Sequence, residues 1–226
     1  MNVTVNGISL YYRVEGSGAV PMVLLHGNGE SEEIFASFRH ALQAALPGCF
    51  RVWSFDSRGQ GQSQKGVRLS YRLMAEDIDR AMRMLGIDNP VVLGFSDGAI
   101  VALMMGARLD TPMRKIIACG PNLSPRGLKF SVRAAGAIGW MLTRNPLLKM
   151  MIREPDLKES ELDKIGIPVL VTGGAHDMIR RRELVAIADA LPQGTLKILP
   201  GEGHSSYITD GEKLLDAVKE FLLKDR

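Results

Sequence analysis

This sequence of 226 residues lacks several features that would place it in a specialised class of protein. It contains no run of about twenty apolar residues, the length that a membrane-spanning helix requires. Residues 1–12 contain neither a basic segment nor a long apolar run, so we expect no signal peptide and no stable membrane insertion. There is also no internal repeat and no low-complexity segment. We therefore expect a soluble protein with one sizeable core, because folds of this length are commonly single domains.

Cysteine and clustered basic residues are also scarce. The two cysteines, Cys49 and Cys119, form no disulfide framework and lack the spacing of metal ligands. We expect two reduced thiols in a cytoplasmic protein, and no metal site. The formal charge of +3 is mild, and the longest basic run, at 180–182, has the length of an ordinary solvated helix start. No nucleic-acid partner is expected.

What is present is the regular alternation of an α/β protein. Hydrophobic residues make up 46% of the chain and charged residues 23%, the composition of an ordinary globular protein. Short β-type runs alternate with helical segments, which predicts a mostly parallel sheet with helices on both faces. Strands are expected at 3–14 (a hairpin turning at Asn6-Gly7), 21–25, 51–55, 91–95, 115–118, 167–172 and 195–199, and helices at 33–46, 71–85, 97–108, 181–191 and 211–223.

One interval, 122–165, interrupts this alternation. It contains no β-type run, but it has helical candidates at about 128–140 and 146–152, and from 124 to 158 it has seven Lys/Arg against two acidic residues. We predict a helical cap inserted into a single domain of residues 1–226; the alternative is a pair of ordinary covering helices. Its charges could attract anionic acyl substrates or an anionic membrane surface, or be the solvated face of a lid whose Trp140 and methionines line the pocket.

The segment 91–100 indicates the chemistry of the protein. A β-type run leads into Gly94-Phe95-Ser96-Asp97-Gly98, and a helical run of small residues follows. This is the pattern of a nucleophile elbow, a sharp strand-to-helix turn with a serine at its apex. The positions two before and two after the serine must be small, because neighbouring backbone approaches closely there. The pattern predicts Ser96 as a nucleophile at the carboxyl end of the sheet.

A serine nucleophile needs a base, and the base needs an acid to orient it. Of the four histidines, His204 lies in a loop directly after a predicted strand, whereas His40 falls mid-helix among polar residues and His26 is expected to hold a glycine turn. Asp177 follows another predicted strand and is the expected acid, with N-cap of the next helix as its alternative. Ser96, Asp177 and His204 occur in the chain order expected of one α/β architecture.

The oxyanion hole of such a site requires two backbone N–H groups aimed at one point. We expect one from Asp97, at the start of its helix, and the other from Asn28, in the glycine turn that follows a predicted strand. Phe95, Trp140 and Met178 are the expected residues of the substrate pocket.

Together these motifs resemble the α/β-hydrolase superfamily, in its single-domain esterase-like branch. The resemblance implies an eight-stranded, mostly parallel sheet, a Ser-His-Asp triad and no cofactor, with the loop 56–63 in a structural role. Two features depart from the family pattern, since Ala99 stands where many relatives repeat glycine and the insertion is shorter than many lids. The matching motifs are His26-Gly27-Asn28-Gly29, Asp56-x-Arg58-Gly59-x-Gly61-x-Ser63, Gly94-Phe95-Ser96-Asp97-Gly98, Gly173-x-x-x-Asp177 and Gly203-His204.

The implied reaction is hydrolysis through an acyl-enzyme on Ser96. A carboxylic ester of a small molecule is the default substrate, and a thioester, lactone or activated amide suits the same groups. C–C bond hydrolysis, cofactor-free perhydrolysis or a non-catalytic binding protein of this fold are the alternatives. Asp97 could pair with a substrate amine, as in relatives that share Gly-x-Ser-Asp-Gly, or could bond to the protein at the start of its helix. A monomer and a homodimer both stay open.

Overall fold

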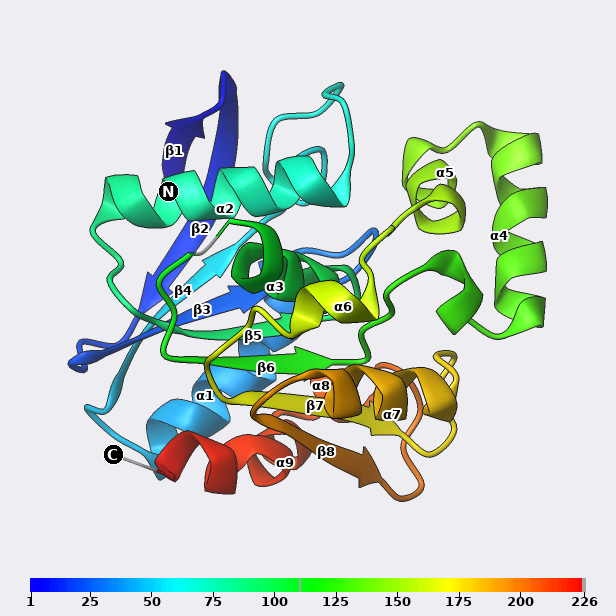
Figure 1. The fold of residues 1–226 in the computed structure, drawn as a ribbon. Coiled ribbons are helices and arrows are strands. Elements are labelled where there is room, and N and C mark those ends of the chain that lie inside the picture. Colours follow the sequence, from blue (N-terminus) through cyan, green and yellow to red (C-terminus); the bar gives the residue numbers. More distant parts are fainter. Residues whose placement is uncertain (110, 225–226) are drawn as a thin grey trace.

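The computed structural model describes residues 1–109 and 111–224, and its centre is one twisted sheet covered by helices on both faces (Figure 1). The strand order is β1-β2-β4-β3-β5-β6-β7-β8. The pairs β1–β2 and β2–β4 are antiparallel, and every other neighbouring pair is parallel. The strands are β1 (Asn2–Val5), β2 (Ile8–Glu15), β3 (Val20–Leu25), β4 (Phe50–Phe55), β5 (Val91–Phe95), β6 (Lys115–Cys119), β7 (Val169–Gly174) and β8 (Gly194–Leu199).

The mostly parallel sheet predicted from the alternation of strands and helices is confirmed, as are the eight strands that the resemblance implies, and most boundaries agree within a few residues. The predicted turn between the first two strands is also present, because Asn6 and Gly7 both have positive φ, of 47° and 76°. The helices are α1 (Ala36–Ala45), α2 (Tyr71–Leu85), α3 (Asp97–Arg108), α4 (Phe130–Thr143), α5 (Pro146–Arg153), α6 (Glu159–Leu162), α7 (Arg181–Ala190), α8 (Ser206–Thr209) and α9 (Gly211–Leu223), with 3-10 turns η1 (Glu32–Phe35) and η2 (Pro125–Gly127).

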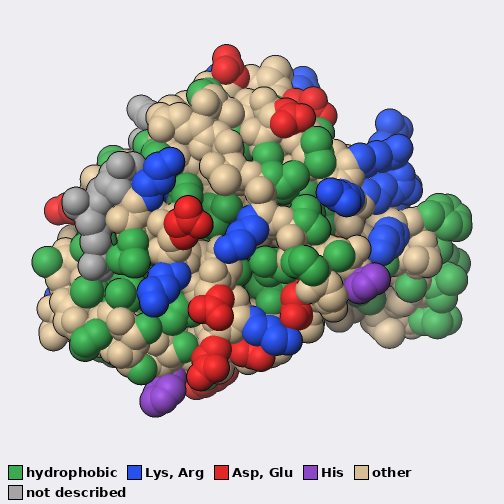
Figure 2. Space-filling model, turned by 90° about the horizontal axis from the view of Figure 1, so that it is seen from below, with side chains coloured by type: hydrophobic (Ala, Val, Ile, Leu, Met, Phe, Trp, Pro, Cys, Tyr) green, Lys and Arg blue, Asp and Glu red, His purple; other side chains and the backbone are tan. Residues whose placement is uncertain are grey.

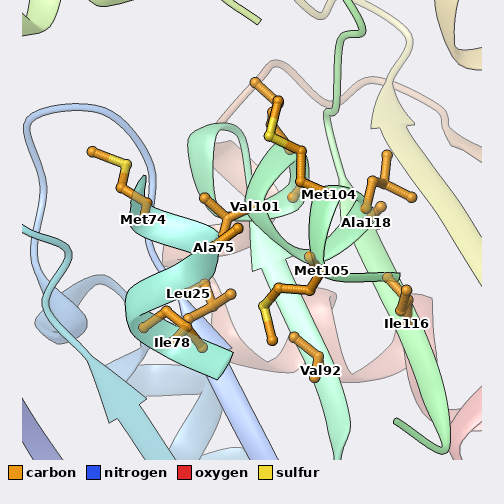
Figure 3. Packing of buried hydrophobic residues seen from close by; sticks show 14 of the residues in the cluster. Leu25, Met74, Ala75, Ile78, Val92, Val101, Met104, Met105, Ile116 and Ala118 are labelled. Carbon is orange, nitrogen blue, oxygen red and sulfur yellow. The ribbon is translucent and has the colours of Figure 1, made fainter. Parts of the chain in front are cut away.

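Side chains alternate between the two faces of the sheet and build a hydrophobic core on each. In β3, Val23 and Leu25 belong to the core under α2, α3 and α7, whereas Met22 and Leu24 belong to the core under α1 and α9. Figure 3 shows the first core, where Leu25 and residues of β5 and β6 meet α2 and α3. Apolar runs without polar interruption therefore suit the central strands, which are buried on both faces.

Helix α3 is buried along almost its whole length, as its nearly all-apolar sequence predicts. Val101 and Met105 of α3 pack into the core between the sheet and α2 (Figure 3). Ala99, where many relatives have glycine, is fully buried in this helix. The packing holds the first turn of α3 directly behind the carboxyl end of β5.

The chain between β6 and β7 contains no strand in the structure. It forms η2, α4, α5 and α6, and α4 and α5 pack on each other at one side of the sheet, at the right of Figure 1. The assignment of 122–165 as the cap of a single domain stays a prediction. Among the described residues, no helix has the length and apolar character needed to cross a bilayer.

Candidate active site

Ser96 occupies the sharp turn between β5 and α3, and its backbone is strained. Its φ and ψ are 51° and −113°, in a region that residues with a side chain rarely adopt. A Cβ atom at Gly94 would collide with the carbonyl oxygen of Gly98, and a Cβ atom at Gly98 would collide with that of Leu25. The two glycines thus allow α3 to approach β3 and β5 closely enough to hold Ser96 at the apex.

The structure brings Ser96, Asp177 and His204 together from three separate loops. His204 Nε2 lies 3.0 Å from Ser96 Oγ, and His204 Nδ1 lies 2.7 Å from Asp177 Oδ1. In the neutral imidazole, the Nδ1–H donates to the carboxylate and leaves Nε2 free to accept from the serine hydroxyl. A Cβ atom at Gly120, whose φ is 64°, would lie 2.8 Å from the imidazole Cε1, so glycine there makes room for the ring.

The carboxylate of Asp177 is buried and held by backbone amides. Its Oδ1 also accepts a hydrogen bond from the Ile179 N–H at 2.8 Å, and its Oδ2 accepts one from the Gly174 N–H at 3.3 Å. The N-cap of α7 is Arg180, so Asp177 does not cap that helix, which was the alternative to its role as acid. The two hydrogen bonds from backbone amides orient Asp177 Oδ1 toward the imidazole.

The turn 26–29 is held in place by hydrogen bonds within the turn and to the residues around it. The buried His26 donates from Nδ1 to the Gly27 carbonyl at 2.7 Å and accepts at Nε2 from the Ser57 N–H at 2.9 Å. Burial lowers the pKa of His26, which keeps its ring neutral for this arrangement. Glu30 Oε2 accepts from the Gly27 N–H at 3.0 Å. His26 is therefore in contact with the loop after β4 rather than with Ser96.

Asn28 and Asp97, whose backbone N–H groups the sequence suggests for an oxyanion hole, line the same cavity as Ser96. Within the described part of the chain, neither N–H has a hydrogen-bond acceptor. The Asp97 N–H also lies at the start of α3, where the helix dipole favours negative charge. That these two groups form an oxyanion hole stays a prediction.

The loop 56–63, which follows β4, is hydrogen-bonded to the elements beside the turn 26–29. Asp56 accepts hydrogen bonds from the Glu32 N–H at 2.7 Å and the Gln62 N–H at 2.6 Å. Arg58 forms two hydrogen bonds to the buried carboxylate of Asp77, at 2.6 and 2.7 Å. These bonds tie the loop to η1 and to α2, and they agree with a structural role.

The side chain of Asp97 bonds to the protein, at positions that the sequence did not predict. Its Oδ1 accepts from the Tyr71 hydroxyl at 2.7 Å and its Oδ2 from Asn28 Nδ2 at 2.9 Å. Burial raises the pKa of Asp97 to about 6, although both hydrogen bonds lower it. Tyr71 stands at the first position of α2 and carries no motif, so no signal in the sequence identifies it as part of the site.

A cavity of about 250 Å³ opens beside Ser96 and His204. Among the described residues, the acidic side chains that line it are Glu30 and Asp97. Phe95 and Met178 also line it, and their role as substrate-pocket residues stays a prediction. The full lining is Asn28, Glu30, Tyr71, Phe95, Ser96, Asp97, Asn122, Leu128, Met151, Met178, His204 and Ser205.

Trp140, the third residue expected in the pocket, does not line this cavity. The Trp140 ring lies instead under the guanidinium groups of Arg144 and Arg153, at 5.5 and 5.4 Å from the ring centre. Cation–π contact of this kind stabilises the position of the ring between α4 and α5. Leu128 and Met151 are the residues of the interval 122–165 that contribute apolar lining.

The two cysteines lie outside the site, and each is a free thiol. Cys119 is fully buried at the end of β6, and burial raises the pKa of its thiol to about 12. A thiol of that pKa is no nucleophile at neutral pH. No group of three or more His, Cys, Asp or Glu is placed to hold a metal ion in residues 1–109 and 111–224.

The sheet order, the serine on a strained strand-to-helix turn and the imidazole between serine and carboxylate define the class of hydrolases built on a parallel α/β sheet. The family model described as alpha/beta hydrolase fold matches residues 20–141, slightly more than half of the chain. This chain belongs to that family, and it is a hydrolase.

Proteins similar to this chain carry different names. A putative carbamate hydrolase of Caulobacter sp. (strain K31) is 27% identical, with 97% of each chain covered. The serine hydrolase BPHL of Mus musculus is 32% identical over 53% of this chain and 42% of that protein. The crystal structure of the enol-lactonase from Burkholderia xenovorans LB400 has a TM-score of 0.79 at 19% identity, covering 99% of this chain and all of that one, which shows the shared fold.

Proposed function

We propose that this hydrolase cleaves a carboxylic ester of a small molecule through an acyl-enzyme on Ser96. The observation that carries the proposal is the unbroken series of short contacts from Asp177 through His204 to Ser96 Oγ, at the edge of a cavity. A thioester or a lactone presents the same acyl carbon and suits the same groups.

Each group in this series has a defined task in the reaction. His204 Nε2 takes the proton of the Ser96 hydroxyl while Oγ attacks the acyl carbon, and Asp177 stabilises the imidazolium that forms. The N–H groups of Asn28 and Asp97 donate hydrogen bonds to the carbonyl oxygen and stabilise the negative charge that develops there. His204 then returns its proton to the leaving alcohol, and water breaks the acyl-enzyme by the same steps.

Covalent labelling with a fluorophosphonate tests the nucleophile. We expect the wild type to be labelled and Ser96→Ala to be unlabelled, because the probe phosphonylates an activated serine. Ser160→Ala, at an exposed position of helix α6, is the matched control and should be labelled as the wild type is. Labelling that persists in Ser96→Ala would contradict the proposal, and so would a wild type that does not react.

Turnover of a substrate panel separates the alternatives that use the same triad. Simple esters, thioesters and lactones are expected to be hydrolysed without added peroxide. A C–C hydrolase would instead cleave dienoic ketoacids far faster than esters, and a perhydrolase would depend on peroxide.

The charges of the cavity restrict the substrate further. Within residues 1–109 and 111–224, Glu30 and Asp97 are the carboxylates that line it, and no Lys or Arg does. Neutral or amine-bearing substrates therefore suit the cavity better than anionic ones. Both oxygens of Asp97 already accept hydrogen bonds from the protein, whereas Glu30 Oε1 accepts none from the described residues. We propose that Glu30 is the carboxylate that pairs with a substrate amine.

Matched esters with and without an α-amino group test this assignment. We expect the wild type to prefer the amine by about tenfold in kcat/KM, the effect of one partly screened ion pair. Glu30→Gln should lose the preference and Asp97→Asn should retain it; the ratio between the two esters cancels any general loss of rate. Equal rates for the two esters in the wild type would refute recognition of a substrate amine. If Asp97→Asn alone lost the preference, the amine would pair with Asp97 and not with Glu30.

A further inference from the structure

Helix α4 leaves one apolar face uncovered. Of the six large hydrophobic side chains that are exposed in the described residues, four lie on this helix of 14 residues. They are Phe130, Ile138, Met141 and Leu142, which are 73%, 58%, 63% and 79% exposed. Figure 2 shows hydrophobic side chains gathered at the right-hand end of the molecule, where α4 lies in Figure 1. We call these four residues the α4 stripe.

The opposite face of α4 fixes the direction in which the stripe points. Gly136 and Gly139 face α5, since a Cβ atom at Gly136 would lie 2.5 Å from Met151 Cε and one at Gly139 would lie 2.9 Å from Leu148 Cδ1. At 100° per residue, the stripe centres on the side of the helix away from these glycines. Because α4 and α5 pack this closely, the stripe cannot turn inward without separating the two helices.

Basic side chains without carboxylate partners lie on α4, on the neighbouring helix α5 and at the ends of α4. From 124 to 158 the chain has seven Lys/Arg and two acidic residues. Both acids are engaged within the protein, since Glu154 accepts from the Tyr71 N–H at 3.1 Å and Asp156 pairs with Arg108 at 3.1 Å. In contrast, no carboxylate of the described chain pairs with five basic residues of α4, its two ends and α5, which are Lys129, Arg133, Arg144, Lys149 and Arg153.

We propose that α4 docks this protein on the surface of an anionic lipid bilayer. The α4 stripe enters the boundary between headgroups and acyl chains, and the basic residues beside it contact the lipid phosphates, as in interfacial amphipathic helices. Charge complementarity selects this partner over a second copy of the chain, because a second α4 would bring the same excess of positive charge. The binding is peripheral, and it does not depend on the chemistry proposed for Ser96.

Co-sedimentation with vesicles tests the apolar part of the proposal. We expect the protein to bind vesicles that contain phosphatidylserine in phosphatidylcholine, and to remain in solution with phosphatidylcholine alone. Leu142→Ser should weaken the partition coefficient by about tenfold, the effect of withdrawing one inserted Leu side chain. Met84→Ser is the matched control, because Met84 is a 57% exposed hydrophobic residue on α2, and it should bind as the wild type does.

Substitution of the basic residues tests the electrostatic part. Arg133→Gln should weaken binding by about fivefold and reduce its dependence on salt, because one phosphate contact is lost. Lys219→Gln, on the exposed side of α9, is the control and should change neither quantity. The substituted side chains are solvent-exposed or partly exposed, so thermal unfolding should show unchanged stability.

Three results would overturn the proposal. The first is equal sedimentation with and without anionic lipid. The second is wild-type binding by Leu142→Ser. The third is a concentration-dependent dimer that Leu142→Ser abolishes while the wild type ignores vesicles, which would make a second copy the partner of the α4 stripe.

Discussion

At the scale of single residues, Asp97 differs most from what its motif suggests. Its position after Ser96 invites an interpretation as a contact for substrate, yet its carboxylate is buried between Tyr71 and Asn28. Asn28 also lines the cavity, and its side chain donates to Asp97. This hydrogen bond holds the turn 26–29 against the first turn of α3, the two segments that would supply the proposed oxyanion hole.

The titration of Asp97 gives a prediction at this scale. Its carboxyl has a pKa of about 6 in the folded protein against an ordinary value of 3.8. Between these values the folded state holds a proton that the unfolded state has released, so the free energy of unfolding falls as pH rises through this window. The loss is on the order of 3 kcal/mol and is complete above about pH 6. Asp97→Asn should lack it, which denaturant unfolding of both proteins across the window can measure.

Carbon-13 shifts of the Asp97 carboxyl provide the direct control. Tyr71→Phe should raise the midpoint above about 6, because the hydrogen bond from the Tyr71 hydroxyl lowers the pKa. A titration midpoint near 3.8 in the wild type would show that burial does not raise the pKa of Asp97.

At the scale of elements, the site depends on the close approach of α3 to the strands. Gly94 lies against the backbone of Gly98, and Gly98 lies against the carbonyl of Leu25 at the end of β3. Neither contact has space for a methyl group, and backbone on both sides cannot yield as a flexible side chain would. The strained φ of Ser96 is therefore maintained by the packing of three elements rather than by local sequence preference.

Gly98→Ala should consequently be among the most damaging single-methyl changes in the chain. We expect it to lower stability by about 3 kcal/mol or more, since overpacking forces the backbone to shift, and to reduce fluorophosphonate labelling. Gly166→Ala is the matched control, because no atom lies within 4 Å of a Cβ there. Thermal and denaturant unfolding measure the stability of the two variants. A Gly98→Ala protein as stable as Gly166→Ala would refute the packing argument.

At the scale of the whole molecule, the parallel sheet assembles the site. The loops that follow β3, β5, β7 and β8 carry Asn28, Ser96, Asp177 and His204, and parallel strands place all these loops at one edge. The interval 122–165 adds Leu128 and Met151 to the cavity, while the residues of its α4 stripe are exposed and are not among the lining residues. One segment thus lines part of the cavity and also carries the helix proposed to dock on lipid.

The sequence by itself determined the fold class and the three residues that meet in the site. Strand and helix periodicity are local properties, and glycine at Gly94 and Gly98 is a local steric demand that an elbow imposes. The meeting of Ser96, Asp177 and His204 could be predicted because each follows a strand of a parallel sheet, so topology alone brings their loops together. Their catalytic roles stay a prediction, which labelling will test.

Only the tertiary structure decided which side chains surround these residues. Tyr71 contacts Asp97 across 26 positions of sequence, and nothing in the helical pattern of α2 marks its first residue for that contact. Trp140 lies under two arginines and not in the cavity, because the rotation of α4 depends on how its glycines pack on α5. The direction of a side chain from a helix depends on the packing of elements far apart in the chain, and local periodicity carries no information about that packing.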